Sequence, residues 1–182
     1  MKLVYEVLDS PIDPLLAIVS PDGLVALEFN GARGLASARK RWSTRLESAT
    51  FEEAPRRRGP MQPVREWFRA YWAGSPVPAL EYRLHGTEFQ VAVWEALFEV
   101  PAGQTRTYGQ LARRVGRPDA ARAVGAAVGQ NPIAIVAPCH RIVGANGSLT
   151  GFGGGLPRKK WLLGHEAAFA PAESGQLALW GA

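Results

Sequence analysis

The spacing of hydrophobic and polar positions changes near residue 86, and this change divides the chain into two parts. Within the first thirty residues, three apolar runs rich in β-forming residues follow one another, LVYEVL, LLAIV and LVALEF. Turn residues separate them, most clearly Ser20-Pro21-Asp22-Gly23. The pattern predicts a three-stranded antiparallel sheet at the N-terminus.

Two helices are expected to accompany this sheet. Residues 32–47 predict a basic helix, and residues 61–73 predict a helix with an aromatic face. The stretch 48–60, which contains EEAPRRRGP, is expected to be a loop, and residues 78–84 an extended segment. We therefore expect residues 1–85 to form a small α/β domain.

In the second part of the chain, hydrophobic residues recur with the spacing of α-helices. Thr87 with Gln90, and Thr107 with Gln110, have the spacing of capping boxes, and each pair precedes a periodic apolar segment. After a short Gly-Arg-Pro break, residues 119–130 predict a further helix. Two short helices joined so closely are typical of a helix-turn-helix.

The remaining segments complete an α+β chain. IAIVA is a short buried run resembling a strand, residues 144–155 are glycine-rich and predict a loop, and residues 157–168 predict a last helix that begins with proline. We expect residues 86–170 to form a mostly helical, winged-helix-like domain, with residues 171–182 as a loosely held tail.

Composition indicates a globular protein with an uneven distribution of charge. Apolar residues make up 47% of the chain and charged residues 20%. Residues 101–165 contain nine Lys or Arg and one acid, Asp119, whereas the rest contains 12 bases and 15 acids. This asymmetry favours a nucleic-acid-binding surface. No apolar run has the roughly 18 residues that a membrane helix needs, and the start does not resemble a signal peptide, so we expect a cytoplasmic protein.

The chain has one cysteine, Cys139, within Pro138-Cys139-His140-Arg141. A single cysteine forms no internal disulfide and no multi-cysteine metal site, so no structural metal is expected. The thiolate is the reactive form of cysteine, and nearby cations lower its pKa. Two interpretations stay open on these residues alone, a reactive thiol and a buried structural cysteine.

A reactive Cys139 would need a base. Side chains of neighbouring residues in a strand point in opposite directions, so we expect a water to bridge Cys139 and His140. An acid that orients the imidazole would complete such a relay, and Glu166 is one of two acids between residues 101 and 170. The alternative for Glu166 is a solvated charge on the last helix.

The predicted helix 119–130 is rich in Ala, Gly and Val, with Arg122 and Gln130 as its only long polar residues. Such a helix cannot specify a base sequence through the major groove, but it can approach the minor groove closely. The alternative is close packing between helices. Asn131 ends this helix as either a turn residue or a functional one, and the glycines after Gly151 either bring backbone donors close to a ligand or form a flexible link.

Three stretches, TYGQLARRVG, AARAVGAAVGQNPIAIVAPCHRIVGANG and GFGGGLPRKKWLLGHE, resemble the O6-alkylguanine-DNA alkyltransferase family. They extend from Thr107 to Glu166 almost without a break, and a looser match reaches back to Thr87. The first eighty residues match only in pattern. Phe152 differs from the tyrosine that is frequent in the family, and the cysteines of some relatives' zinc site are missing.

The resemblance implies a catalytic role for five residues. Cys139 would be the nucleophile and alkyl acceptor, with His140 as its base through water and Glu166 behind it. Tyr108 would donate a hydrogen bond to the guanine as it leaves and would crowd the phosphate. Asn131 would hold the link between the DNA-binding helix and the active-site strand.

The resemblance also implies the partner and the reaction. Damaged guanine in double-stranded DNA would be flipped, with Arg122 filling the gap in the base stack, and an alkyl group would be transferred irreversibly from guanine O6, with O4-alkylthymine as a possible second substrate. We expect a single-turnover monomer without a cofactor, an obligate protein partner or a membrane. DNA contacts are expected from Arg122, Tyr108, Arg117, Gln130 and Arg141, and contacts with the flipped base from Cys139, Ile142, Phe152 and Gly153.

Three other functions remain as alternatives on the sequence. A sequence-specific helix-turn-helix regulator would need base-reading side chains on its second helix. A cysteine hydrolase would turn over a small ester or peptide many times. A lesion-binding protein would recognise damaged DNA without chemistry.

Overall fold

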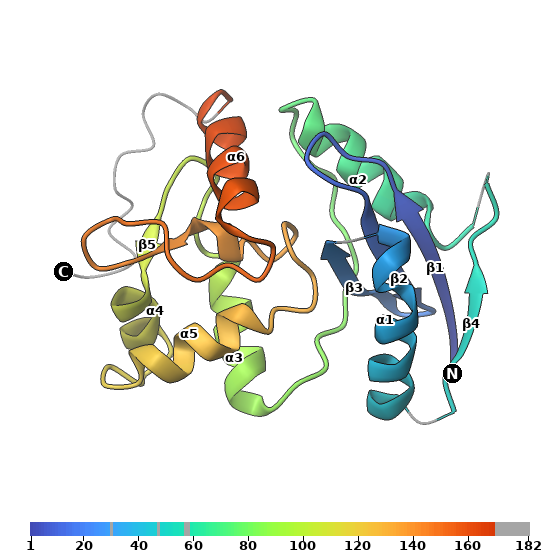
Figure 1. Cartoon of the computed structure of the whole chain (residues 1–182), viewed down its shortest axis with the longest axis horizontal. Helices are drawn as coiled ribbons and strands as arrows, with labels where there is room; N and C mark the ends of the chain where they lie inside the picture. The colour runs from blue at the N-terminus through green and yellow to red at the C-terminus, as the bar shows by residue number, and fades with distance from the viewer. Residues whose placement is uncertain (30, 47, 57–58, 170–182) are drawn as a thin grey trace. The chain divides into compact units, whose positions relative to one another are not determined.

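The computed structural model describes residues 1–29, 31–46, 48–56 and 59–169. The chain divides into two compact units (Figure 1). The first consists of Met1–His85 with Pro132–Ala134, and the second of Gly86–Asn131 with the residues from Ile135 onward. The predicted tail at 171–182 lies outside the described residues. In the described part of the chain, no helix is long and apolar enough to cross a membrane.

A four-stranded sheet forms the centre of the first unit, in the order β3-β2-β1-β4. Its strands are β1 (Lys2–Leu8), β2 (Leu15–Ser20), β3 (Gly23–Phe29) and β4 (Thr50–Glu53). The first three are antiparallel, as predicted, and β2 is buried along its whole length because it lies inside the sheet.

The fourth strand was not predicted, because residues 48–60 were expected to form a loop. β4 pairs in parallel with β1, so the sheet is mixed. Phe51 is the one residue of β4 that packs against the core, and the other three are exposed. A short edge strand with a single apolar anchor has no alternating pattern, and its pairing with β1 depends on contacts far along the sequence.

Two helices cover the sheet. Helix α1 (Gly31–Arg45) contributes Ala38 and Trp42 to a buried cluster with Leu3 and Ile18 of the sheet. Helix α2 (Gln62–Trp72) is joined to β1 by Arg65, whose guanidinium donates to the carboxylate of Glu6. Since Leu3 and Glu6 point to opposite faces of β1, the two helices lie on opposite faces of the sheet.

Residues 132–134 return from the middle of the chain to β3 of the first unit. The N–H of Leu27 donates to the carbonyl of Pro132 at 2.8 Å, and the N–H of Ala134 donates to the carbonyl of Leu27 at 3.0 Å. The predicted IAIVA strand is therefore a short bridge followed by a turn at Ile135, whose φ is 71°. The run is apolar because all five residues are buried.

The second unit is mostly helical, and the predicted helices are present with small shifts of their ends. Its elements are α3 (Glu88–Leu97), β5 (Arg106–Thr107), α4 (Tyr108–Arg114), α5 (Ala121–Gly129), a 3₁₀ turn η1 (Cys139–Arg141), β6 (Ile142–Val143) and α6 (Leu156–Ala167). Both capping boxes are formed, at Thr87 with Gln90 and at Thr107 with Gln110. Helices α4 and α5 form the helix-turn-helix and pack against each other (Figure 1).

Helix α5 is attached to α3 by a buried indole. The Nε1–H of Trp94 donates to the carbonyl of Ala127 at 2.8 Å. Val124, Ala127 and Val128 form the buried side of α5, so its other small residues remain available at the surface.

Candidate active site

The single cysteine lies in η1, immediately after Pro138, and its side chain is almost entirely buried. Burial raises the pKa of the Cys139 thiol, because a thiolate loses hydration there. A hydrogen bond from Asn131 and the positive charge of Lys159 act in the opposite direction but do not outweigh burial. In the resting protein Cys139 is therefore a neutral thiol.

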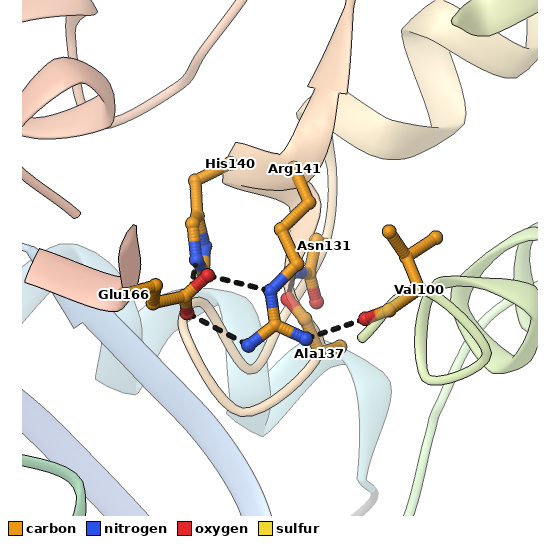
Figure 2. Close-up of polar contacts among 6 residues, drawn as sticks. All are labelled: Val100, Asn131, Ala137, His140, Arg141 and Glu166. Atoms are coloured by element: carbon orange, nitrogen blue, oxygen red, sulfur yellow. Dashed lines mark hydrogen bonds and ion pairs between the residues drawn. The ribbon is translucent and has the colours of Figure 1, made fainter. Parts of the chain in front are cut away.

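His140, Glu166 and Arg141 form one network of hydrogen bonds (Figure 2), in which His140 and Glu166 are fully buried. The Nε2 atom of His140 lies 2.8 Å from Oε1 of Glu166. Arg141 donates from Nε to Oε2 of Glu166 at 2.8 Å and from a terminal nitrogen to Oε1 at 2.7 Å. The carboxylate thus orients both the imidazole and the guanidinium, and α6 is positioned against η1.

In this network Glu166 is ionised and His140 is neutral. Burial alone would raise the pKa of Glu166, but the hydrogen bonds from His140 and Arg141 outweigh it and hold that pKa well below its usual range. Burial lowers the pKa of His140 more than Glu166 raises it, so the imidazole is neutral at pH 7. Its second ring nitrogen, Nδ1, is buried without a protein partner among the described residues. A neutral imidazole with one free nitrogen can accept a proton.

Asn131 connects the end of α5 to the residues before the cysteine. Its amide nitrogen donates to the carbonyl of Ala137 at 2.8 Å (Figure 2). The bond closes the segment between them into a loop, and the same side chain reaches the Cys139 sulfur. Asn131 thus ties the end of α5 to a residue two positions before the cysteine.

Tyr108 begins α4 and contacts the glycine-rich loop. Its hydroxyl lies 3.1 Å from the carbonyl of Thr150 and 2.9 Å from that of Gly151. Gly151 has a φ of 52°, and a Cβ there would lie 2.9 Å from the Tyr108 hydroxyl, so this close approach requires glycine. Next to it, Phe152 is half-buried and Gly153 is exposed.

One buried residue beside the cysteine was not predicted. Lys159 of α6 is fully buried, and its ammonium donates to the carbonyl of Ile142 at 2.5 Å and to that of Thr150 at 2.7 Å. Lys159, Leu162 and Glu166 are the buried residues of α6, at intervals of three and four residues. That spacing places the lysine on the same helix face as Glu166, which is the sequence evidence that could have identified it.

The residues expected to contact DNA lie mostly on exposed parts of the helix-turn-helix. Arg122, Ala123, Ala126 and Gly129 are exposed along α5, and Arg117 is exposed in the turn before it. The exposed side chain of Gln130 accepts a hydrogen bond from Gln90 at 2.7 Å. Apart from Arg122, the exposed side of α5 is formed by small residues.

The position of Arg141 differs from the expected contact with DNA. Besides its two bonds to Glu166, the guanidinium donates to the carbonyl of Val100 at 2.5 Å (Figure 2). Only 12% of the side chain is exposed. Its donors are directed into the second unit, so it orients Glu166 instead of binding a phosphate.

Comparison with known proteins finds a family model, curated relatives and solved structures that are similar to this chain. A family model described as the DNA-binding domain of 6-O-methylguanine DNA methyltransferase matches residues 88–168. The methylated-DNA–protein-cysteine methyltransferase of Methanosarcina acetivorans is 41% identical, and the match covers 88% of this chain and 96% of the relative. The solved structure of the Mycobacterium tuberculosis O6-methylguanine methyltransferase has a TM-score of 0.77 at 40% identity, covering 94% of this chain and 96% of that one. The M. tuberculosis protein in complex with DNA has a TM-score of 0.76 at 39% identity, with the same coverage.

Proposed function

The chain belongs to the methylated-DNA–protein-cysteine methyltransferase family, and we propose that Cys139 is the residue that accepts the alkyl group. The function is DNA repair, in which the alkyl group on O6 of guanine is transferred directly to a cysteine of the protein. The main support for Cys139 is that the only cysteine of the chain directly precedes a buried histidine whose Nε2 lies 2.8 Å from a carboxylate.

The proposed reaction begins with removal of the thiol proton. Nδ1 of His140 accepts it through a bridging water, and Glu166 stabilises the imidazolium that forms. The sulfur of Cys139 then attacks the alkyl carbon, an S–C bond forms, and the bond from carbon to guanine O6 breaks. The guanine receives the electron pair of that bond and one proton, in net the proton that the thiol gave to His140. The products are therefore a thioether, neutral guanine and a neutral imidazole.

Tyr108 and the backbone around the cysteine are proposed to hold the guanine. The alkyl carbon is buried inside a duplex, so the nucleotide has to rotate out of the stack before the sulfur can reach it. Tyr108 would exchange its bonds to the loop carbonyls for a bond to the leaving base. Backbone groups of Cys139 and Ile142 and the loop at Phe152 and Gly153 would hold the flipped guanine.

The second unit is proposed to contain both the chemistry and the DNA-binding surface. Helix α5 would lie in the minor groove, where its small residues permit close approach. Arg122 would occupy the space that the flipped base leaves, and Arg117 and Gln130 would contact the DNA beside it. The reaction balances without a redox group, so we propose a monomer that acts without a cofactor in the cytoplasm.

The proposal predicts stoichiometry instead of turnover, because a thioether has no easy leaving group and cannot regenerate the thiol. The protein is incubated with excess duplex that contains O6-methylguanine, and the methyl groups lost from DNA are counted per chain. We expect one methyl group per chain, and none with Cys139→Ala. A count well above one, or full activity of Cys139→Ala, would exclude Cys139 as the acceptor.

A further inference from the structure

Lys159 is a buried cation without a carboxylate partner among the residues that the structure describes. Its side chain is fully buried, and its only hydrogen bonds there go to two backbone carbonyls. Placing an unpaired ammonium in a protein interior is costly. A methionine would fill similar space without that cost, so packing alone does not account for a lysine here.

The two carbonyls belong to separate parts of the active site. Ile142 lies in β6, three residues after the cysteine, and Thr150 lies in the glycine-rich loop. The carbonyl of Thr150 also lies 3.1 Å from the hydroxyl of Tyr108, and the Lys159 ammonium is 6.0 Å from the centre of the tyrosine ring. Lys159 therefore connects β6, the loop and the start of α4.

The charges of the site leave one cation for the thiolate. Proton transfer from Cys139 to His140 gives the site two anions, Glu166 and the thiolate, and three cations, Arg141, the imidazolium and Lys159. Arg141 contacts Glu166 through two hydrogen bonds. The imidazolium has Glu166 as its partner. The ammonium of Lys159 is bonded to the carbonyl of Ile142, three residues after the cysteine, and both Lys159 and Cys139 are buried. Lys159 is therefore the buried cation left for the sulfur, and its charge acts to lower the pKa of the Cys139 thiol. The titratable groups that face Lys159 are Cys139 and His140 on η1 and Tyr108 on α4.

We propose that Lys159 is a positioning residue whose charge stabilises the Cys139 thiolate during transfer while its hydrogen bonds hold the glycine-rich loop against β6. The inference rests on the proposed role of Cys139 as alkyl acceptor. An opposite charge nearby favours the ionised form of a thiol. Removing the charge should therefore make the thiol harder to ionise.

The test separates the charge of Lys159 from its hydrogen bonds. Lys159→Gln keeps N–H donors and loses the charge, whereas Lys159→Arg keeps the charge. Lys160→Gln removes the neighbouring exposed lysine and serves as the control. The rate at which iodoacetamide alkylates Cys139 is measured against pH for all four proteins, without DNA, after circular dichroism shows which are folded.

The expected result is a shift of the pH–rate midpoint upward by about one unit or more in Lys159→Gln, with a rate about tenfold lower at pH 7. Lys159→Arg and Lys160→Gln should keep midpoints close to the parent's. A parental midpoint in Lys159→Gln would overturn the proposal, as would an equal shift in Lys159→Arg. Methyl transfer from duplex DNA to the parent is measured in parallel, so a failure of the alkyl-acceptor role is recognised separately.

Discussion

At the scale of single residues, the burial of Cys139 opposes its chemistry. Burial raises the pKa of the thiol, so the nucleophile does not exist in advance and has to be formed when a base accepts the proton. The buried neutral imidazole beside it provides that base. A protein that reacts once benefits from this arrangement, because a neutral thiol reacts more slowly than a thiolate with other electrophiles before the protein meets damaged DNA.

Glu166→Gln tests the proton relay. Glutamine can still accept a hydrogen bond from His140, but it lacks the charge that stabilises the imidazolium. We expect the transfer rate to fall by roughly 10²-fold, whereas affinity for duplex DNA stays within about twofold because Glu166 is buried away from the surface. The measurement is single-turnover transfer together with DNA binding at equilibrium.

The loss of the bonds from Arg141 to a charged group should also destabilise Glu166→Gln, by about 2 kcal/mol. The matched control is Glu99→Gln, which breaks the exposed ion pair with Arg114 in the same unit. An exposed pair contributes little, so the control should transfer at the parental rate. Equal rates in the parent and Glu166→Gln would remove Glu166 from the relay.

Residues of the candidate site could be predicted from the sequence where their residue type is rare in the surrounding chain. Cys139 is the only cysteine, and Glu166 is one of two acids in a basic region, so each was a candidate for chemistry. Lys159 was missed because three consecutive bases, Arg158 to Lys160, suggest a solvated surface and do not reveal which one is buried. Arg141 was wrongly expected at the DNA because sequence neighbours do not show that its donors reach Glu166 and Val100.

At the scale of elements, local interactions made the second unit easier to predict than the first. The capping boxes at Thr87 and Thr107 fix helix starts within four residues of sequence, and both are formed. Strand β4 and the bridge at Ile133 depend on partners more than 45 residues away in sequence, for which the local pattern holds no information. The second unit was easier to predict because its helix starts depend on contacts between residues close in sequence, whereas β4 and the bridge depend on residues far apart in sequence.

Arg122 on helix α5 is proposed to assist the flipping of the damaged base. If Arg122 fills the gap left by the flipped base, it matters most when the target base is paired and stacked, since extrusion then costs most. We expect Arg122→Ala to slow repair of duplex DNA by roughly tenfold or more, and to have a much smaller effect on a short single strand with the same lesion. Transfer rates on the two substrates provide the comparison.

Arg113→Ala is the control for that prediction, because Arg113 is an exposed cation at the end of α4. It should lower both rates only through salt-dependent affinity. If Arg122→Ala reduces repair equally on both substrates, Arg122 is a phosphate contact. Strong dependence on the flanking base sequence would argue against placing α5 in the minor groove.

At the scale of the whole molecule, the segment between α5 and the cysteine belongs to both units. Asn131 ends the part of the second unit that contains the helix-turn-helix, Pro132–Ala134 pair with β3 of the first, and the chain then reaches Cys139. Three of the nine residues between α5 and Cys139 therefore belong to the first unit.

The central claim is that the alkyl group of damaged guanine ends on Cys139. The most direct test is peptide mapping by mass spectrometry after the protein has reacted with duplex DNA that contains O6-methylguanine. We expect the peptide with Cys139 to gain the mass of one CH₂ group, in proportion to the guanine restored in the DNA. Restored guanine with an unmodified Cys139 peptide, or with the methyl group on another residue, would contradict it.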